Sequence, residues 1–523
     1  MNTSEFLTIA ASVVPERTAM VCDGESRTYA ALQERVNRLA NTLQSLGVSK
    51  GDKVSVMALN SIAYVEIYYA CAKLGAVFVP LNYRAKQEEL SYMCNNSETA
   101  VLFVGERYLG PAAAIRPELK TVKHLICIDA RPKGMANYED LLAAHEPEEI
   151  FTDVEDMDPT IIIYTSGTTA LPKGVVLTYL GMSVYVTNTV EPADPAAEDV
   201  DVLLVSVPFY HVAGATTMLS SVWGGRKMVI LAQFDPAAWL EAVQTHRVTH
   251  SFVVPTMLKR IMDQPGFDKC DLRSLKLLAY GAAPMPYEVV TRAVKVFRCG
   301  LMNAYGQTES TSSLTFLGPE DHIIPESPPE EREKKLRRLR SVGRAMEDMA
   351  VAVVDPSGNV MPPGQEGEIV AQGARIMSGY LGRHEETHEA MRGGWLHTGD
   401  VGWMDEEGYL YITGRTKDLI IRGGENIAPG EIEAVLEQHP AVEETAVIGV
   451  RDVEWGEEVK AIIIPKHGQK PSPEELTAFV KARLASFKAP KYYAFVGELP
   501  RNYLGKVLKT ELRKLHGEAK SEL

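Results

Sequence analysis

The spacing of apolar residues near the start of the chain constrains the fold more than any other feature. An apolar side chain recurs at every third or fourth position, at Leu32, Val36, Leu39, Leu43 and Leu46. This spacing predicts a helix, with Thr28 as its N-cap. The run at 53–58 predicts a strand, and a helical stretch to about Lys73 leads to a second strand at 76–80. Such alternation predicts an α/β fold with largely parallel sheets.

The length of the chain and the pattern of its last part predict a division into domains. A chain of 523 residues is too long for one compact core, so we expect at least two domains. Near the end, helical and strand patterns predict a small α+β unit from the segments 431–439, 445–450, 460–465 and 473–485. The stretch 414–426 is dense in glycine and charge and predicts a hinge. We therefore predict a large N-terminal domain at 1–414 and a small mobile C-terminal domain at 415–523.

The charge balance bears on possible partners. The formal net charge is −15, and binding to a phosphate backbone needs a basic surface, so nucleic acid is not an expected partner. Small anionic ligands would need basic groups gathered locally against this acidic background.

The cysteines and the apolar runs bear on location. The six cysteines are sparse, and none stands in a C-x-x-C pair. This usage indicates buried thiols in a reducing compartment, which we take to be the cytoplasm, and not a disulfide framework or a zinc site. No apolar run approaches the roughly 18 residues that a membrane helix needs, so no transmembrane segment is predicted. The oligomeric state stays open, with a homodimer as one option.

A polar loop after a short apolar strand carries the strongest local signal. Residues 161–164 are Ile-Ile-Ile-Tyr, and 165–174 read T-S-G-T-T-A-L-P-K-G. Glycine lets backbone N–H groups approach an anion, the hydroxyls add donors, and Lys173 adds a positive charge, which together suit a polyphosphate. The loop lacks the Walker pattern. A polar surface turn is the alternative interpretation of the same residues.

The order T-S-G-T-T-x-x-P-K-G resembles the signature of the adenylate-forming superfamily, which includes acyl-CoA synthetases, luciferases and the adenylation domains of peptide synthetases. The resemblance implies a large multi-layered α/β domain, a small mobile α+β domain, and the use of ATP, Mg²⁺ and coenzyme A. It implies that the nucleotide contacts in this loop are Thr165, Ser166, Gly167, Thr168, Thr169 and Lys173. The family usually has glycine where this chain has Ala170. A positive φ there would cost alanine about 1 kcal/mol.

Two further segments resemble family motifs around the acyl group and adenine. The segment 208–214, P-F-Y-H-V-A-G, resembles the aromatic–histidine segment beside the acyl pocket. There His211 would orient the carboxylate or gate the thiol channel; a structural histidine is the alternative. The segment 280–284, Y-G-A-A-P, resembles the segment that packs on adenine. Its small residues Gly281, Ala282 and Ala283 would leave a slot for a flat ring, and a tight turn is the alternative.

The segment 303–309, N-A-Y-G-Q-T-E, resembles the family's Y-G-x-T-E motif. The resemblance implies that Tyr305 stacks near adenine, that Thr308 binds the α-phosphate and that Glu309 holds Mg²⁺, a hard cation that prefers carboxylate and phosphate oxygens. The neighbouring nucleotide contacts would be Asn303, Ala304 and Gly306. A strand end with a surface carboxylate is the alternative interpretation.

The remaining motifs concern the ribose and the catalytic lysine. The segment 395–400, W-L-H-T-G-D, resembles the ribose-binding segment, because the carboxylate of Asp400 could accept hydrogen bonds from both ribose hydroxyls. Ile412 and Arg415 would add a second contact to the ribose or the phosphate. The segment 500–506, P-R-N-Y-L-G-K, resembles the catalytic-lysine loop and makes Lys506 the catalytic lysine. A solvated lysine is the alternative.

The resemblance also implies two conformations. Lys506 would bridge the acyl carboxylate and the α-phosphate in the first step, and the C-terminal domain would then rotate about Lys417. After rotation, Gly423 and Gly424 would line the tunnel for the pantetheine arm of coenzyme A, since glycine allows close backbone approach. Trp455 would pack near coenzyme A, or else be a core or edge aromatic of the small domain.

These features predict an ATP-dependent acid–CoA ligase. It would convert a carboxylate and ATP to acyl-AMP and pyrophosphate, and then transfer the acyl group to coenzyme A. The segment 208–214 lacks the aspartate of aminoacyl-adenylating relatives, and Gly306 stands where acetate-specific relatives have tryptophan. We therefore expect a medium- or long-chain fatty acid, with an aromatic or alicyclic acid as the alternative. A ligase that loads a carrier protein, a luciferase-like oxygenase and a non-catalytic nucleotide-binding relative stay open.

Overall fold

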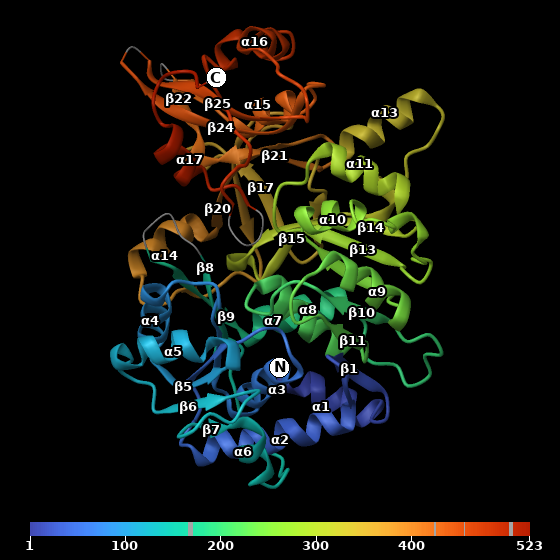
Figure 1. The fold of residues 1–523 in the computed structure, drawn as a ribbon, viewed down its shortest axis with the longest axis vertical. Coiled ribbons are helices and arrows are strands. Elements are labelled where there is room, and N and C mark those ends of the chain that lie inside the picture. Colours follow the sequence, from blue (N-terminus) through green and yellow to red (C-terminus); the bar gives the residue numbers. More distant parts are fainter. Residues whose placement is uncertain (166–170, 423–424, 454, 502–505, 523) are drawn as a thin grey trace.

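The computed structural model describes residues 1–165, 171–422, 425–453, 455–501 and 506–522. Figure 1 shows the N-terminal elements at one end of the molecule and the C-terminal elements, in orange to red, at the other. The described part of the chain contains no helix that is both long and apolar enough to cross a membrane. All six cysteines are free thiols, and Cys22, Cys71, Cys94 and Cys127 are buried.

One sheet of the N-terminal part runs in the order β19-β9-β8-β4-β3-β5-β6-β7. Its strands are β3 (Lys53–Met57), β4 (Val77–Pro80), β5 (Thr99–Val104), β6 (His124–Cys127), β7 (Ala136–Asn137), β8 (Pro159–Thr165), β9 (Lys173–Thr178) and β19 (Gly379–Tyr380). The pairs from β8 to β7 are parallel, whereas β9 pairs antiparallel with β8. Thr165 pairs with Lys173, so the two ends of the predicted phosphate loop are side by side.

A second sheet runs in the order β16-β15-β14-β13-β12-β10-β11-β1-β2. Its strands are β1 (Thr18–Cys22), β2 (Glu25–Thr28), β10 (Val202–Val205), β11 (Lys227–Ile230), β12 (His250–Val253), β13 (Leu277–Gly281), β14 (Gly300–Gln307), β15 (Ser312–Leu317) and β16 (Arg344–Ala345). The strands β13 and β14 are parallel neighbours, with Gly281 opposite Ala304. The predicted adenine segment and Y-G-x-T-E motif therefore meet at the carboxyl edge of this sheet, where α/β folds bind ligands.

A smaller antiparallel sheet lies next to that edge. It runs β17 (Ala350–Val354), β18 (Gly367–Gln372), β20 (Leu396–Met404) and β21 (Leu410–Arg415). In the pair β20–β21, Asp400 lies opposite Arg415. This register joins the predicted ribose segment to the end of the strand that leads into the C-terminal part.

The C-terminal part has its own sheet and its own apolar cores, which include Ile432, Val447 and Ile463. Its strands are β22 (Ile420–Arg422), β23 (Glu425–Ile427), β24 (Val442–Asp452), β25 (Gly456–Pro465) and β26 (Tyr492–Phe495), and its helices are α15 (Pro429–Leu436), α16 (Pro473–Lys481) and α17 (Lys509–His516). This confirms the predicted α+β composition. The boundary at 414/415 falls at the end of β21 and stays a prediction.

The N-terminal helices cover the two large sheets. They are α1 (Ser4–Val13), α2 (Tyr29–Ser45), α3 (Ile62–Leu74), α4 (Gln87–Asn96), α5 (Leu109–Ile115), α6 (Tyr138–Ala143), α7 (Tyr179–Thr189), α8 (Val212–Trp223), α9 (Pro236–His246), α10 (Pro255–Met262), α11 (Tyr287–Val296), α12 (Pro319–His322), α13 (Pro329–Arg338) and α14 (His384–Ala390). The predicted cap of α2 is confirmed, because the Thr28 side chain accepts a hydrogen bond from the Ala31 backbone N–H at 3.2 Å.

Short 3₁₀ helices complete the described structure: η1 (Glu106–Tyr108), η2 (Arg116–Glu118), η3 (Phe267–Lys269), η4 (Thr308–Ser310), η5 (Arg392–Gly394), η6 (Thr416–Asp418) and η7 (Ser486–Lys488). Two of them occupy predicted site positions. η4 carries the end of the Y-G-x-T-E motif, and η6 carries the predicted hinge residue Lys417.

A buried ionic network joins α2, α3 and α6 far from these positions. Glu66 in α3 is fully buried. Its two carboxylate oxygens accept from Arg35 Nε at 2.6 Å and Nη2 at 3.1 Å, and the Tyr138 hydroxyl donates at 2.5 Å. Burial, and then the charge of Glu66, raise the pKa of Tyr138 well above its usual value. Tyr138 therefore stays a neutral donor, and the carboxylate has the partners that a buried charge requires.

Replacing Arg35 with methionine should destabilise the N-terminal part by about 3 kcal/mol, because the fully buried Glu66 would lose its charge partner. Urea unfolding followed by fluorescence measures this change. The matched control is Arg131→Met, which removes a pair with Asp140 in which both side chains are exposed. That change should cost less than about 1 kcal/mol. Equal effects of the two substitutions would contradict the role of burial.

Candidate active site

The carboxylate of Asp400 joins three strands at the carboxyl edge of the large sheet. Asp400 in β20 is buried. Its Oδ2 accepts from the Tyr305 hydroxyl of β14 at 2.8 Å, and its Oδ1 lies 2.7 Å from Arg415 Nε at the end of β21. Burial, followed by the charge of Asp400, raises the pKa of Tyr305 well above its usual value. The predicted adenine and ribose residues therefore form one hydrogen-bonded group, in which Tyr305 is a neutral donor.

The backbone beside this group is closely packed. A Cβ on Gly281 would lie 2.1 Å from the Ala304 carbonyl oxygen, so position 281 has room for glycine alone. The next residue, Ala282, has φ +63°, a left-handed conformation that costs a non-glycine residue about 1 kcal/mol or more. Such strain is typical of functional sites, and here it falls on the predicted adenine segment. The position of Ala170, where the sequence predicts similar strain, is outside the described residues.

Gly306 has a steric role that the sequence did not reveal. A Cβ at this position would lie 1.8 Å from the Ser312 carbonyl oxygen of β15. The β14–β15 register also shifts between Tyr305 and Gly306. Position 306 therefore requires glycine, because the backbone of β15 lies so close to it. A larger residue would fit only if β15 moved away.

The turn η4 presents the predicted phosphate and metal residues. Thr308 is the first residue of this turn and Glu309 is the second. The Glu309 Oε1 accepts from the Tyr380 hydroxyl at 2.9 Å, and the Glu309 carbonyl oxygen accepts from the Met377 backbone N–H at 2.8 Å. Among the described residues there is no group of three or more metal-ligating side chains. A single carboxylate fits Mg²⁺ that arrives with a nucleotide, because Mg²⁺ then takes its other ligands from phosphate and water.

The lysine of the phosphate loop lies close to this turn. Lys173 Nζ is 2.7 Å from Glu386 Oε2 in α14 and 4.8 Å from the centre of the Tyr380 ring. The hydrogen bond from Lys173 lowers the pKa of Glu386. Burial opposes this effect, and the hydrogen bond from Arg383 adds to it. Lys173 is therefore paired with the carboxylate of Glu386, and it lies over the ring of Tyr380, whose hydroxyl binds Glu309. Of the other loop residues, Thr165 ends β8, and Ser166, Gly167, Thr168 and Thr169 lie outside the described residues.

The predicted catalytic lysine, Lys506, lies within the same charged group. Burial, and then repulsion from Arg415, lower its pKa to about 8, and Asp400 acts in the opposite direction. Burial and Arg415 also lower the pKa of Lys417. The C-terminal part is thus docked with Lys506 near the predicted ribose residues Asp400 and Arg415, which is the arrangement that the sequence analysis predicts for the first step. The predicted tunnel residues Gly423 and Gly424 are outside the described residues.

Two ion pairs join the parts of the chain in this arrangement. Lys259 of α10 lies 3.3 Å from Glu443, and Glu288 of α11 lies 3.5 Å from Lys466. All four side chains are more than a third exposed, so each pair contributes little free energy. Such weak contacts would suit the mobile C-terminal domain that the sequence analysis predicts.

The predicted acyl-pocket segment begins α8. His211 is the N-cap residue of that helix, and its ring centre is 4.4 Å from that of Tyr210. Burial, and then the charge of Arg84, lower the pKa of His211 to about 3, so the imidazole is neutral at physiological pH. A Cβ on Gly214 would lie 2.3 Å from the Pro208 carbonyl oxygen. His211 is therefore suited to line a wall or donate a hydrogen bond, and not to act as a cation.

Two other predicted residues lie further out. Trp455, directly before β25, is 39% exposed, and its ring centre lies 4.7 Å from the Arg422 guanidinium. It is therefore not a core aromatic of the small domain, and its contact with coenzyme A stays a prediction. Ile412 lies in β21 opposite Gly402 and packs on the apolar cluster under the small sheet.

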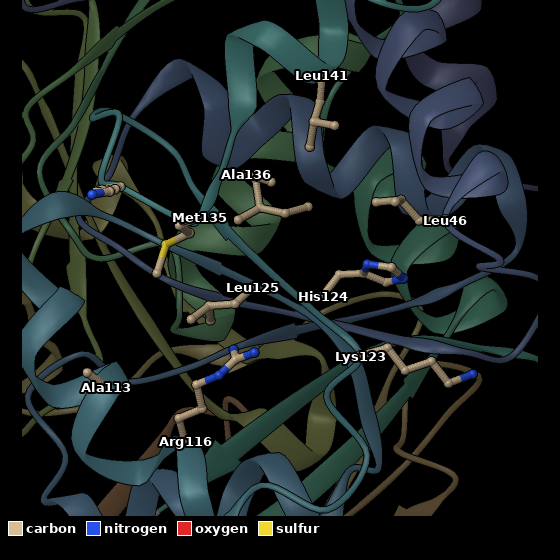
Figure 2. Close-up of a pocket in the computed structure, with 12 residues that line it drawn as sticks. Leu46, Ala113, Arg116, Lys123, His124, Leu125, Met135, Ala136 and Leu141 are labelled. Carbon is tan, nitrogen blue, oxygen red and sulfur yellow. The ribbon is translucent and has the colours of Figure 1, made fainter.

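A separate cavity lies at the far edge of the first sheet. It has a volume of about 370 Å³ and is lined by β6, β7 and the helices beside them, with Arg116, Lys123 and His124 among its residues. Figure 2 shows these side chains around an apolar floor that includes Leu125 and Met135. None of the predicted site residues lines it, so this cavity is distinct from the candidate active site.

Sequence reasoning missed three residues around the predicted ones. Tyr380 contacts Glu309, Glu386 contacts Lys173, and Arg375 contacts the backbone directly after Glu309. They lie between the motifs, after β18, in β19 and in α14. The density of charge at 383–389 is a visible signal in the sequence. Nothing in the local pattern indicates that Arg375 is fully buried, because its partners come from distant parts of the chain.

Comparison with known proteins agrees with this geometry. Residues 7–381 match the AMP-binding enzyme family, and residues 431–506 match the AMP-binding enzyme C-terminal domain. A feruloyl-CoA synthase from Amycolatopsis sp is 36% identical over 508 residues, which cover 97% of each chain. The fatty acid–[acyl-carrier-protein] ligase ScoC from Streptomyces coeruleorubidus is 33% identical over 506 residues, which cover 95% of this chain and 93% of the relative.

Among solved structures, a Mycobacterium tuberculosis fatty acyl CoA synthetase superposes with a TM-score of 0.79 at 33% identity, covering 99% of this chain and 98% of the other. The predicted α/β fold with a small C-terminal α+β part is confirmed. Both matched regions and the full-length relatives lead to the same conclusion: this chain belongs to the AMP-binding enzyme family.

Proposed function

We propose that this chain joins a carboxylic acid with a large apolar body to a thiol, and that Lys506, Thr308, Glu309 and Asp400 carry the first half-reaction. The family assignment makes the chain an ATP-dependent acid–CoA ligase that uses ATP, Mg²⁺ and coenzyme A. The observation that carries the residue roles is the position of Lys506. This lysine of the C-terminal part is half-buried and lies within the range of the charges of Arg415 and Asp400.

In the first half-reaction, an oxygen of the substrate carboxylate attacks the α-phosphorus of ATP, and pyrophosphate leaves. Two anions must approach each other, so the site has to supply positive charge where negative charge develops. Lys506 would lie between the carboxylate and the α-phosphate, and Thr308 would hold that phosphate. Lys173 would contact the outer phosphates in place of Glu386. Mg²⁺ held by Glu309 would neutralise charge on the leaving pyrophosphate.

Asp400 and Tyr305 would position the nucleoside. Tyr305 Oη and Arg415 Nε already bind separate oxygens of the carboxylate, and each oxygen has a second lone pair for a ribose hydroxyl. The ring of Tyr305 would stack near adenine, beside the small residues Gly281, Ala282 and Ala283. The guanidinium of Arg415 would also contact a phosphate of the nucleotide.

In the second half-reaction, the thiol of coenzyme A attacks the acyl carbon, and AMP leaves. In the first step Lys506 would lie at the approach to that carbon, so we expect the C-terminal part to move. We place the pivot at Lys417, in the turn η6 directly after β21. The segment with Gly423 and Gly424 would then meet the pantetheine arm, and Trp455, exposed just before β25, would meet coenzyme A.

The acid is proposed from the pocket wall. His211 is neutral, and the residues that follow it, Val212 to Gly214, are small and apolar, which favours a medium- or long-chain fatty acid. The similar fatty acyl CoA synthetase of known structure supports this choice. An aromatic acid is the second candidate, favoured by the feruloyl-CoA synthase relative. A carrier protein is the second candidate acceptor, favoured by the relative ScoC.

Lys506→Ala should reduce acyl-adenylate formation by about 10²–10³, because a preorganised charge at the transition state is removed. It should leave the conversion of supplied acyl-AMP and coenzyme A to thioester nearly unchanged. The two half-reactions are measured separately, by pyrophosphate release and by thioester formation. The control is Lys514→Ala, an exposed lysine of the same domain, which should change neither rate. Equal loss of both half-reactions in Lys506→Ala would refute the assigned role.

The kcat/KM of adenylation for ATP should fall as the pH rises through about 8. The pKa of Lys506 is lowered to about 8, so its cation is present below that pH and is lost above it, and kcat/KM reports the ionisation of the free enzyme. Lys506→Arg should remove the fall between pH 7 and 9.5, since a guanidinium keeps its charge there. A fall that persists unchanged in Lys506→Arg would assign the ionisation to another group.

A further inference from the structure

A buried ion pair lies beneath the turn that carries Thr308 and Glu309. Arg375 is fully buried. Its Nε and Nη2 bind the two oxygens of the Asp348 carboxylate at 2.5 and 3.0 Å. Asp348 precedes β17, and Arg375 follows β18. The geometry is the two-point pairing that fixes both the position and the plane of a guanidinium.

The remaining donors of Arg375 hold the backbone of the turn. Its Nη1 donates to the Ser313 carbonyl oxygen at 2.8 Å and reaches that of Ser310 at 3.5 Å. In return, the Thr311 hydroxyl donates to the carbonyl oxygen of Arg375 at 2.5 Å. The stretch 310–313, directly after Glu309, is thus bound from both sides by one residue.

This stretch needs such support because its backbone is strained. Thr311 has φ +49° and Ser312 has φ +83°, two consecutive non-glycine residues in the left-handed region. Each costs about 1 kcal/mol or more and persists where surrounding contacts determine it. Ser312 is also the residue whose carbonyl oxygen excludes a side chain at Gly306. The path of the turn is therefore imposed by its contacts and not by its local sequence.

The same short segment also holds Glu309 itself. Two residues after Arg375, the Met377 N–H donates to the Glu309 carbonyl oxygen at 2.8 Å. Three residues further on, the Tyr380 hydroxyl donates to the Glu309 carboxylate at 2.9 Å. Residues 375–380 thus contact the turn through a guanidinium, a backbone amide and a phenol. Among these three contacts, the guanidinium is the one held by a carboxylate, that of the partly buried Asp348.

We propose that Arg375, oriented by Asp348, is a positioning residue for adenylation: it fixes the turn so that Thr308 and Glu309 face the α-phosphate and its Mg²⁺. The inference rests on the proposed roles of those two residues. Groups behind a metal ligand typically change metal affinity or activity by about 10–100-fold when they are removed. A purely structural ion pair would instead lower stability without any selective effect on Mg²⁺.

The test is calorimetric binding of ATP, without any acid, in Mg²⁺ and in EDTA. In Arg375→Met, the gain in ATP affinity that Mg²⁺ provides should shrink by about tenfold. Asp348→Asn, which keeps the shape of the side chain and the arginine, should show a smaller loss of the same kind. It also serves as the second variant if Arg375→Met fails to fold. Adenylation should fall in both variants, while thioester formation from supplied acyl-AMP stays within about twofold of the wild type.

The matched control is Arg35→Met, which breaks a similarly buried arginine–carboxylate pair far from the site. It should lower the midpoint of thermal unfolding but leave the Mg²⁺-dependent gain in ATP affinity unchanged. An unchanged gain in both Arg375→Met and Asp348→Asn, or an equal loss in Arg35→Met, would overturn the inference. If the wild-type protein itself bound no ATP, the proposed function would fail instead, so the two failures are distinguishable.

Discussion

The arrangement of the site depends on one buried carboxylate, that of Asp400. It joins Tyr305 of the large sheet to Arg415 of the small antiparallel sheet, at 2.8 and 2.7 Å. Arg415 ends the strand that leads into the C-terminal part, and its charge acts on Lys506. The same interaction thus orients the nucleoside residues, links two sheets and sets the electrostatic environment of the catalytic lysine.

The charges around Asp400 connect the two half-reactions. Arg415, Lys417 and Lys506 are crowded near one carboxylate, and mutual repulsion adds to burial in lowering the pKa of both lysines. The phosphates of ATP would relieve this repulsion and favour the docked arrangement. Loss of pyrophosphate would restore part of it, and the weak ion pairs at the domain contact would oppose departure little. In the proposed mechanism, charge would therefore couple the chemical step to the domain movement.

The sequence predicted those parts of the site that lie in short contiguous segments. Helix α2, its Thr28 cap and the strand edge with Tyr305 follow from local pattern or motif, because their residues are neighbours in the chain. The support of Glu309 could not be predicted, since Tyr380 is 71 residues from it and Asp348 is 27 from Arg375. Gly306 shows the same limit: the sequence suggested an open pocket, but the contact with Ser312 depends on how β15 pairs.

The central claim is that this site activates large apolar acids for transfer to a thiol. Pyrophosphate release with ATP and Mg²⁺ tests it directly, across acids from acetate through fatty acids of increasing length to benzoate and cinnamate, with and without coenzyme A. The account predicts sustained release that requires both coenzyme A and one class of large acid, and at most about one equivalent per enzyme when coenzyme A is left out. Release with none of the acids, or release with acetate as fast as with any larger acid, would contradict it.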